Sequence, residues 1–218
     1  MTTTSLRIGV LARGPGAGRA KPELLAAHGA SWVDGLYAAM LRDTLDGLQA
    51  IDADDYVVFA DPGGAEVLAR HAPLPWRVVE QPETSPEGRV LGALGALLAE
   101  GGRAVLAASD APSYPTEPLV EALAEEDASF VLGPSEDGGV LVIATSRLEP
   151  RLLEGAPFGT PALVDTIRAR CTDLGIAPRP LPTWYDVDRP SDVLRLLDEL
   201  RRHPERAPRT AQFLVTAG

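Results

Sequence analysis

The chain has 218 residues, of which 45% are hydrophobic, and its formal net charge is -11 at pH 7. This size and composition are typical of a globular protein with a substantial buried core and argue against a disordered chain. The acidic balance argues against nucleic acid or an anionic membrane as the main partner, so an anionic substrate would need a local basic pocket with a metal ion. The single cysteine, Cys171, excludes an internal disulfide and a cysteine-based zinc cluster.

Targeting signals are not visible in the sequence. The polar start of the chain leads directly into an expected strand, and the longest apolar run, residues 91–99, is too short to span a bilayer. Together with the lone cysteine, which fits a reducing compartment, this predicts a cytoplasmic protein.

Apolar runs and helical spacing predict strands that alternate with helices along the whole chain. The expected strands are residues 6–11, 55–60, 76–80, 104–108, 129–132 and 140–143. The expected helices are residues 31–50, a short one ending near 71, 89–100, 116–126, 160–174 and a last one ending at 202. Such alternation predicts an α/β fold with three layers, α/β/α, around a mostly parallel sheet. Residues 1–218 are expected to form one domain, with 203–218 as a loose tail that carries at most a short terminal strand.

The loop after the first strand combines glycines with basic residues. Gly14, Gly16 and Gly18 would expose backbone N–H groups to phosphate oxygens, and Arg19 and Lys21 would add positive charge. Lys21 is the only lysine of the chain. The glycine spacing fits neither a P-loop nor a dinucleotide fingerprint, and an exposed flexible loop is the alternative. We predict a phosphate-binding loop.

Acidic residues follow the later strands. Asp110, directly after the fourth strand and Ser109, could ligate Mg²⁺ or Mn²⁺, although an Asx turn is the alternative. Glu136 and Asp137 follow the fifth strand and precede Gly138 and Gly139, a pattern that also suits a polar hairpin turn. Because ligands bind beyond the carboxyl ends of parallel strands, these groups should meet at one edge of the sheet.

A last acidic pair precedes the final predicted helix. Asp186 and Asp188 alternate in a segment that should be extended, so one is expected to face the site and the other to brace the helix. Trp184 is placed where it could line an acceptor pocket.

These motifs, in this order, resemble those of a known family. They are Gly-Arg-x-Lys at 18–21, Ser-Asp-x-Pro at 109–112, Gly-Pro-x-Glu-Asp-Gly-Gly at 133–139 and Asp-Val-Asp-x-Pro-x-Asp at 186–192. The set is similar to bacterial glycosyltransferases of the arsenosugar-biosynthesis type, which have the GT-A, or nucleotide-diphospho-sugar transferase, fold. The last two motifs also resemble 2-phospholactate guanylyltransferase. The resemblance covers about residues 6–202.

The resemblance implies a role for each matching residue. It places Gly18, Arg19 and Lys21 in the nucleotide-phosphate loop. We expect Gly14 and Gly16 of the same loop, and Ser109 after the fourth strand, to bind the nucleotide as well. The resemblance implies Asp110 as a metal ligand with Asp188 as a second one. It places Glu136, Asp137, Gly138 and Gly139 in the acceptor-side or sugar-side loop. For glycosyl transfer we expect Asp137 or Glu136 to act as the base, and Gly138, Gly139, Trp184 and Asp186 to bind the substrate. The chain departs from the family at Pro22-Glu23, where Thr-Arg is usual, at Val140, where an aromatic residue is usual, and at Ala108, where glycine is usual.

The function that we predict is a Mg²⁺- or Mn²⁺-dependent glycosyl transfer from a nucleoside diphosphate sugar to a small-molecule acceptor. The alternatives are a nucleotidylyltransferase that joins an NTP to a phosphorylated small molecule, and a non-catalytic nucleotide-binding domain. Glu23, in place of an arginine, argues mildly against the nucleotidylyltransferase. Neither nucleic acid nor a membrane is expected as a partner, and a homodimer is left open.

Overall fold

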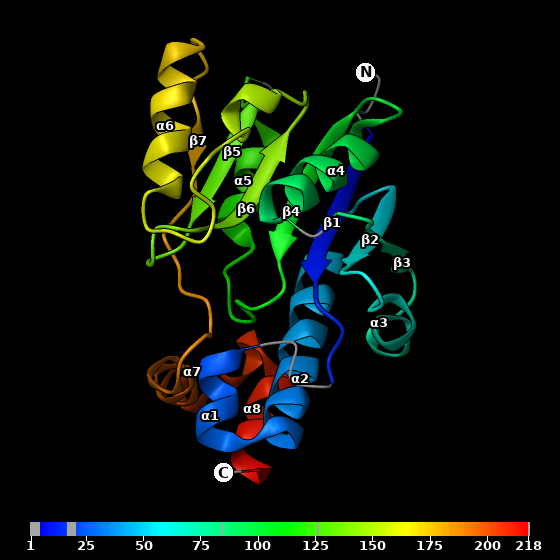
Figure 1. The fold of residues 1–218 in the computed structure, drawn as a ribbon, viewed down its shortest axis with the longest axis vertical. Coiled ribbons are helices and arrows are strands. Elements are labelled where there is room, and N and C mark those ends of the chain that lie inside the picture. The colour runs from blue at the N-terminus through cyan, green and yellow to red at the C-terminus, as the bar shows by residue number, and fades with distance from the viewer. Residues whose placement is uncertain (1–4, 17–20, 84, 126, 218) are drawn as a thin grey trace.

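The computed structural model describes residues 5–16, 21–83, 85–125 and 127–217, and a seven-stranded sheet forms its centre (Figure 1). Its strands are β1 (Leu6–Ala12), β2 (Asp55–Ala60), β3 (Arg77–Glu80), β4 (Arg103–Ala108), β5 (Phe130–Pro134), β6 (Val140–Thr145) and β7 (Arg179–Pro180). They lie in the order β3-β2-β1-β4-β6-β5-β7, and β6 runs antiparallel to both of its neighbours while the other pairs are parallel. The predicted α/β fold with a mostly parallel sheet is confirmed.

Helices cover both faces of this sheet and one of its edges. They are α1 (Pro22–His28), α2 (Ala30–Gln49), α3 (Ala65–His71), α4 (Pro86–Leu98), α5 (Glu117–Ala124), α6 (Leu163–Asp173), α7 (Pro190–Arg202) and α8 (Pro208–Thr216), with 3₁₀ turns η1 (Pro150–Leu152) and η2 (Pro204–Arg206). Among the helices of the described ranges, none is long and apolar enough to cross a bilayer.

Alternate residues of each strand belong to different layers. In β1, Ile8 and Val10 pack with residues of α2 and α5, whereas in β4 Leu106 packs with residues of α4 and α6. Gly9 lies on the α4 side, where an added Cβ would come within 2.7 Å of the Phe59 side chain and 2.9 Å of the Leu97 side chain, so a larger residue would displace these side chains. The three-layer arrangement follows from this alternation.

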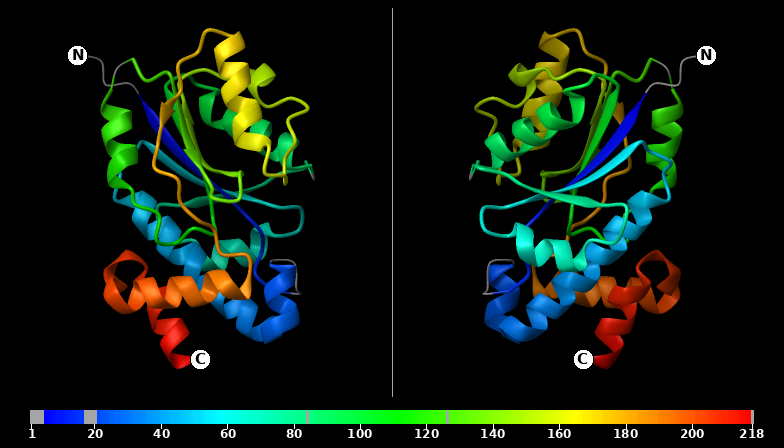
Figure 2. Two further views of the ribbon diagram at one scale, coloured as in Figure 1. Left: turned by 90° about the vertical axis from the view of Figure 1, so that its left-hand side faces the viewer. Right: turned by 90° about the vertical axis from the view of Figure 1, so that its right-hand side faces the viewer.

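A group of helices lies beyond the carboxyl ends of β1 and β4. It consists of α1, the N-terminal part of α2, α7 and α8, which share their own buried cluster (Figures 1 and 2). We call it the helical group. Helix α2 joins it to the sheet, because Leu36 and Met40 belong to the helical cluster and Leu41 and Leu45 to the sheet core.

The prediction of a loose tail with a terminal strand was wrong. The tail forms η2 and α8, and α8 packs along α2. The backbone N–H groups of Arg209 and Thr210 donate to the carboxylate of Asp43, at 3.2 and 2.7 Å, and so cap the start of α8. The buried side chains of Ala207, Thr210 and Leu214 recur at helical spacing, a pattern that the surrounding polar residues conceal.

Candidate active site

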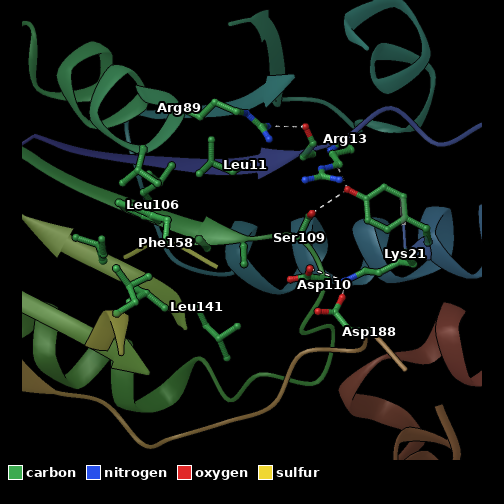
Figure 3. A pocket seen from close by; sticks show the side chains of 18 of the residues that line it. Leu11, Arg13, Lys21, Arg89, Leu106, Ser109, Asp110, Leu141, Phe158 and Asp188 are labelled. Carbon is green, nitrogen blue, oxygen red and sulfur yellow. Dashed lines mark hydrogen bonds and ion pairs between the residues drawn. The ribbon is translucent and has the colours of Figure 1, made fainter. Parts of the chain in front are cut away.

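The carboxyl ends of β1, β4 and β5 lie at one edge of the sheet, because β4 is parallel to β1 and both β4 and β5 are antiparallel to β6. There Lys21 Nζ donates to Asp110 Oδ2 at 2.6 Å and also to Asp188 Oδ1 (Figure 3). Residues from three distant parts of the chain therefore meet at one point, as the sequence predicted for Lys21 and Asp110.

Lys21 is held in an uncommon conformation for this contact. It is the N-cap of α1 with φ 57° and ψ 64°, a left-handed backbone that costs a side-chain-bearing residue about 1 kcal/mol or more. Its side chain is only 6% exposed. Burial by itself would lower the pKa of Lys21, but the carboxylates of Asp110 and Asp188 raise it above its ordinary value. The ammonium group therefore stays charged inside the site.

Asp186 joins Asp110 and Asp188 in an acidic cluster. One carboxylate oxygen from each lies within 4.8 Å of the others. Burial, and then the charges of Asp110 and Asp188, raise the pKa of Asp186 to about 6. One ammonium does not balance three carboxylates, and oxygen ligands of this kind suit Mg²⁺ and Mn²⁺. The residues present therefore fit a divalent cation.

The expectation that Asp186 and Asp188 point to opposite faces was wrong. The segment is not a strand: it makes one bridge, between Ser135 and Trp184, and is irregular afterwards. Val187 N–H then donates to the carbonyl of Asp110 at 3.0 Å, which turns both aspartates toward β4. Alternation holds only for regular extended backbone.

The glycine loop already has anionic partners. Gly14 N–H donates to Asp61 Oδ1 at 2.9 Å, and Gly16 N–H donates to Asp34 Oδ1 at 2.8 Å. A phosphate that bound these N–H groups would have to replace a carboxylate, so their predicted role is not evident in this conformation. Gly18 and Arg19 lie outside the described residues, and their role stays a prediction.

A cavity of about 530 Å³ extends from the acidic cluster over the sheet. Lys21, Ser109, Asp110 and Asp188 lie at one end, and Arg13 and Arg89 lie along one side (Figure 3). Apolar side chains form the other end: Leu11, Val90, Leu106, Val140, Leu141, Ile143, Phe158, Leu163 and Ile167.

Tyr37 and Arg89 were not predicted from the sequence. Tyr37 OH accepts from Arg13 N–H and lies 2.9 Å from Ser109 Oγ. Burial raises the pKa of Tyr37, so the phenol keeps its proton and can donate it to Ser109. The guanidinium of Arg89 donates to the carbonyl of Ala12 and to Gln81 Oε1, which fixes it beside β1. Both residues come from helices whose pattern gave no sign of a partner at this edge.

The turn at 135–139 borders the cluster without entering the cavity. Glu136 accepts from both Arg195 nitrogens, at 2.5 and 2.8 Å, and these bonds hold the pKa of Glu136 below its usual range. Asp137 Oδ1 accepts from Gly139 N–H at 2.8 Å, which is an Asx turn. Gly138 has φ 87° and requires glycine.

Trp184 lies apart from the cavity lining. Its indole N–H donates to Ser113 Oγ at 3.3 Å, and its ring stacks on that of Tyr185. Here it supports the turn between β5 and the acidic segment.

The model of one protein family, described as "Uncharacterized protein conserved in bacteria (DUF2064)", matches residues 44–160. Among curated proteins, none matches the chain.

Solved structures share the fold. A candidate nucleotide-diphospho-sugar transferase from Desulfovibrio desulfuricans G20 is 24% identical, with a TM-score of 0.87 over 97% of this chain and 94% of its own. A nucleotidyl transferase from Methanothermobacter is 19% identical, with a TM-score of 0.64 over 91% and 99%. Glucosyl-3-phosphoglycerate synthase from Mycobacterium tuberculosis, in complex with Mg²⁺ and UDP, is 14% identical, with a TM-score of 0.52 over 94% and 80%. The fold is therefore that of nucleotide-diphospho-sugar transferases and nucleotidyltransferases.

Proposed function

The chain belongs to the bacterial DUF2064 family, and we propose that it is a metal-dependent transferase that uses a nucleotide-activated donor. The favoured reaction is glycosyl transfer from a nucleoside diphosphate sugar to a small-molecule acceptor. The observation that carries this proposal is the meeting of Lys21 with Asp110, Asp186 and Asp188 at the mouth of a cavity. Cations and acids arranged in this way suit a diphosphate leaving group, whose charge must be stabilised as the bond to it breaks.

Each group at the cluster has a role in this proposal. Asp110, Asp186 and Asp188 would hold Mg²⁺ or Mn²⁺, which supplies positive charge next to the diphosphate oxygens. Lys21 contributes a fixed ammonium beside the same acids. Ser109 Oγ shares a hydrogen bond with Tyr37 OH and, with Tyr37 as the donor, would offer its own O–H to a donor phosphate oxygen.

The acceptor hydroxyl needs a base only in glycosyl transfer. Of the two acids in the turn, Glu136 is held by Arg195 and its lowered pKa makes it a weak proton acceptor. Asp137 uses one oxygen in the Asx turn and lies near enough to Asp186 to raise the pKa of Asp186. We therefore assign the base to Asp137.

Nucleotidyl transfer is the second candidate. Arg13 and Arg89 line the cavity and provide cations for an acceptor phosphate or for the leaving pyrophosphate. Against this, Glu23 also lines the cavity, and it pairs with Arg189 at 3.2 Å and so neutralises that cation.

A panel of nucleotides tests the proposal. Thermal unfolding is measured with UDP, GDP, CDP, ADP and dTDP and with the triphosphates, each with and without Mn²⁺. A nucleotide at about a hundred times its Kd should stabilise the protein by about 2.7 kcal/mol. Stabilisation by diphosphates supports glycosyl transfer, and selective stabilisation by one triphosphate supports nucleotidyl transfer.

The variant Asp110→Asn should lose the Mn²⁺-dependent part of this stabilisation. Asp173→Asn, on the exposed side of α6, is the matched control and should retain it. The proposal is wrong if no nucleotide stabilises the wild-type protein, or if the two variants respond alike.

A further inference from the structure

The far end of the cavity is lined mainly by apolar side chains, and Arg89, which is bonded to Gln81 and to the carbonyl of Ala12, lies along one side of it. Its floor consists of Leu11 from β1, Leu106 from β4 and Ile143 from β6. Val90 of α4 forms one wall and Ile167 of α6 the other. Figure 3 shows Leu11, Leu106, Leu141 and Phe158 gathered at the end opposite to Lys21 and Asp188.

Several of these side chains are incompletely buried although they face the interior layer. Leu11, Val90, Val140 and Phe158 are half-buried and pack against the core beneath α4 and α6. A ligand that covered them would gain the free energy of removing their apolar surface from water. The cavity thus offers one polar end and one apolar end to the same molecule.

The backbone N–H and C=O groups at the apolar end already form hydrogen bonds within the sheet. Leu11 is in register with Ala108, and Leu106 is in register with Ile143, within the hydrogen-bonded ladders of the sheet. A nucleobase or a sugar ring placed against Leu106, Ile143 and Ile167 would bury donors and acceptors that these side chains cannot pair. Burying polar groups without hydrogen-bond partners is costly, which disfavours both kinds of ligand.

We propose that the acceptor is an amphiphile, a compound with a hydroxyl or phosphate head and a hydrocarbon body. This rests on the proposed function, because it assigns the acceptor of that transfer. The head lies at the polar end of the cavity, next to the acidic cluster, and the body lies between α4 and α6 against Leu11, Val140 and the other apolar residues. The nucleotide then occupies the side of the cluster away from the apolar end.

A homologous series of n-alkyl phosphates tests this assignment. Inorganic phosphate and methyl, butyl and hexyl phosphate are titrated calorimetrically into the wild-type protein with Mn²⁺ and without nucleotide. Affinity should rise about fourfold for each added methylene group, because each buries apolar surface. An affinity that is independent of chain length would overturn the proposal.

Matched variants locate the hydrocarbon. Val140→Thr keeps the shape of the side chain and places a hydroxyl in the apolar end. It should therefore lower the affinity for hexyl phosphate about fivefold or more and leave the affinity for inorganic phosphate unchanged. Val120→Thr makes the same change on α5, at a residue that is 47% exposed, and should alter neither of these two affinities. Thermal unfolding without ligand checks that both variants fold.

Two further outcomes separate the hypotheses. Displacement of hexyl phosphate by uridine or guanosine, which lack phosphate, would place a nucleobase in the apolar end and overturn the proposal. Chain-length dependence without any nucleotide binding would refute the transferase and leave the amphiphile site standing. Nucleotide binding without chain-length dependence would refute only the amphiphile.

Discussion

The ammonium group of Lys21 lies between two carboxylates at the place where a divalent cation would bind. Asp110 and Asp188 are respectively 25% and 51% exposed at the side chain, whereas Lys21 is 6% exposed. The lysine is therefore the group that must stay paired, since an unpaired buried charge is costly. A cation that binds the acids has to share them with this ammonium.

Removing the ammonium should change metal binding in a defined direction. In Lys21→Met, the three acids lose their internal cation, and we expect Mn²⁺ to stabilise the variant against heat more than it stabilises the wild-type protein. Without metal, the variant should lose about 1–3 kcal/mol of stability, because the acids are partly solvated. Arg201→Met, which removes an exposed cation on α7, is the control. Weaker Mn²⁺ stabilisation in Lys21→Met than in wild type would mean that Lys21 assists the metal.

The adjacent acids Glu136 and Asp137 provide a second comparison. If Asp137 is the base, Asp137→Asn should lower kcat by about a hundredfold or more. Glu136→Gln should change kcat by only a few fold, because Glu136 is engaged with Arg195. Steady-state kinetics on the nucleotide found in the panel makes this measurement. Equal losses in kcat for the two variants would contradict the assignment.

The site residues that could be predicted are those whose place follows from a strand nearby in the sequence. Asp110 closely follows β4, and Lys21 belongs to the loop that follows β1, so topology places both at one edge. Tyr37 fits an apolar helical stripe, and only the tertiary structure brings its hydroxyl to Ser109. Asp34 and Asp61 accept hydrogen bonds from the N–H groups of the glycine loop, and these contacts also form only when distant segments of the chain fold together.

At the scale of elements, the strands were predictable because strands of a sheet that is covered on both faces form continuous apolar runs in the sequence. The prediction failed where that regularity ends. β7 has two residues and gives no pattern, and the segment from Asp186 to Asp188 is irregular, so the rule of alternating faces did not apply. Helix α1 begins at Pro22, directly after the glycine loop, and no helix was expected between that loop and residue 31.

The turn between β5 and β6 depends on Gly138. A Cβ added there would lie 2.1 Å from the carbonyl oxygen of Pro161, and Val164 N–H donates to the Gly138 carbonyl at 3.1 Å. The turn is thus fitted against the start of α6, and this contact positions Asp137.

Gly138→Ala should therefore destabilise the fold by more than a left-handed backbone alone would explain. Gly155→Ala is the control, because Gly155 also has positive φ, 60°, but an added Cβ there meets nothing within 4 Å. We expect Gly155→Ala to cost about 1–2 kcal/mol and Gly138→Ala about 1–3 kcal/mol more. Denaturant unfolding of both variants gives the difference, and equal costs would show that the turn can move away from Pro161.

At the scale of the whole molecule, the site lies between two hydrophobic cores, that of the sheet and that of the helical group. Asp110 and Ser109 extend from the sheet, whereas Lys21 begins α1 and Asp188 precedes α7, both in the helical group. Helix α2 contributes to both cores, so we expect the sheet and the helical group to unfold in one transition. The acidic chain also concentrates cations along the cavity at Arg13, Lys21 and Arg89, which is where an anionic donor would need them.

This arrangement predicts that α8, far from the acids in sequence, supports their geometry. Leu214 is 5% exposed in the cluster shared by α1, α2 and α7, whereas its neighbour Val215 is 74% exposed. Leu214→Ala should cost about 2–5 kcal/mol, the usual range for a buried leucine, and Val215→Ala should cost almost nothing. If the helical group holds Lys21 and Asp188 in place, Leu214→Ala should also weaken Mn²⁺ binding, measured calorimetrically at a temperature where the variant remains folded. Unchanged Mn²⁺ affinity in a destabilised Leu214→Ala protein would mean that packing of the helical group is not needed to hold the three acids in place.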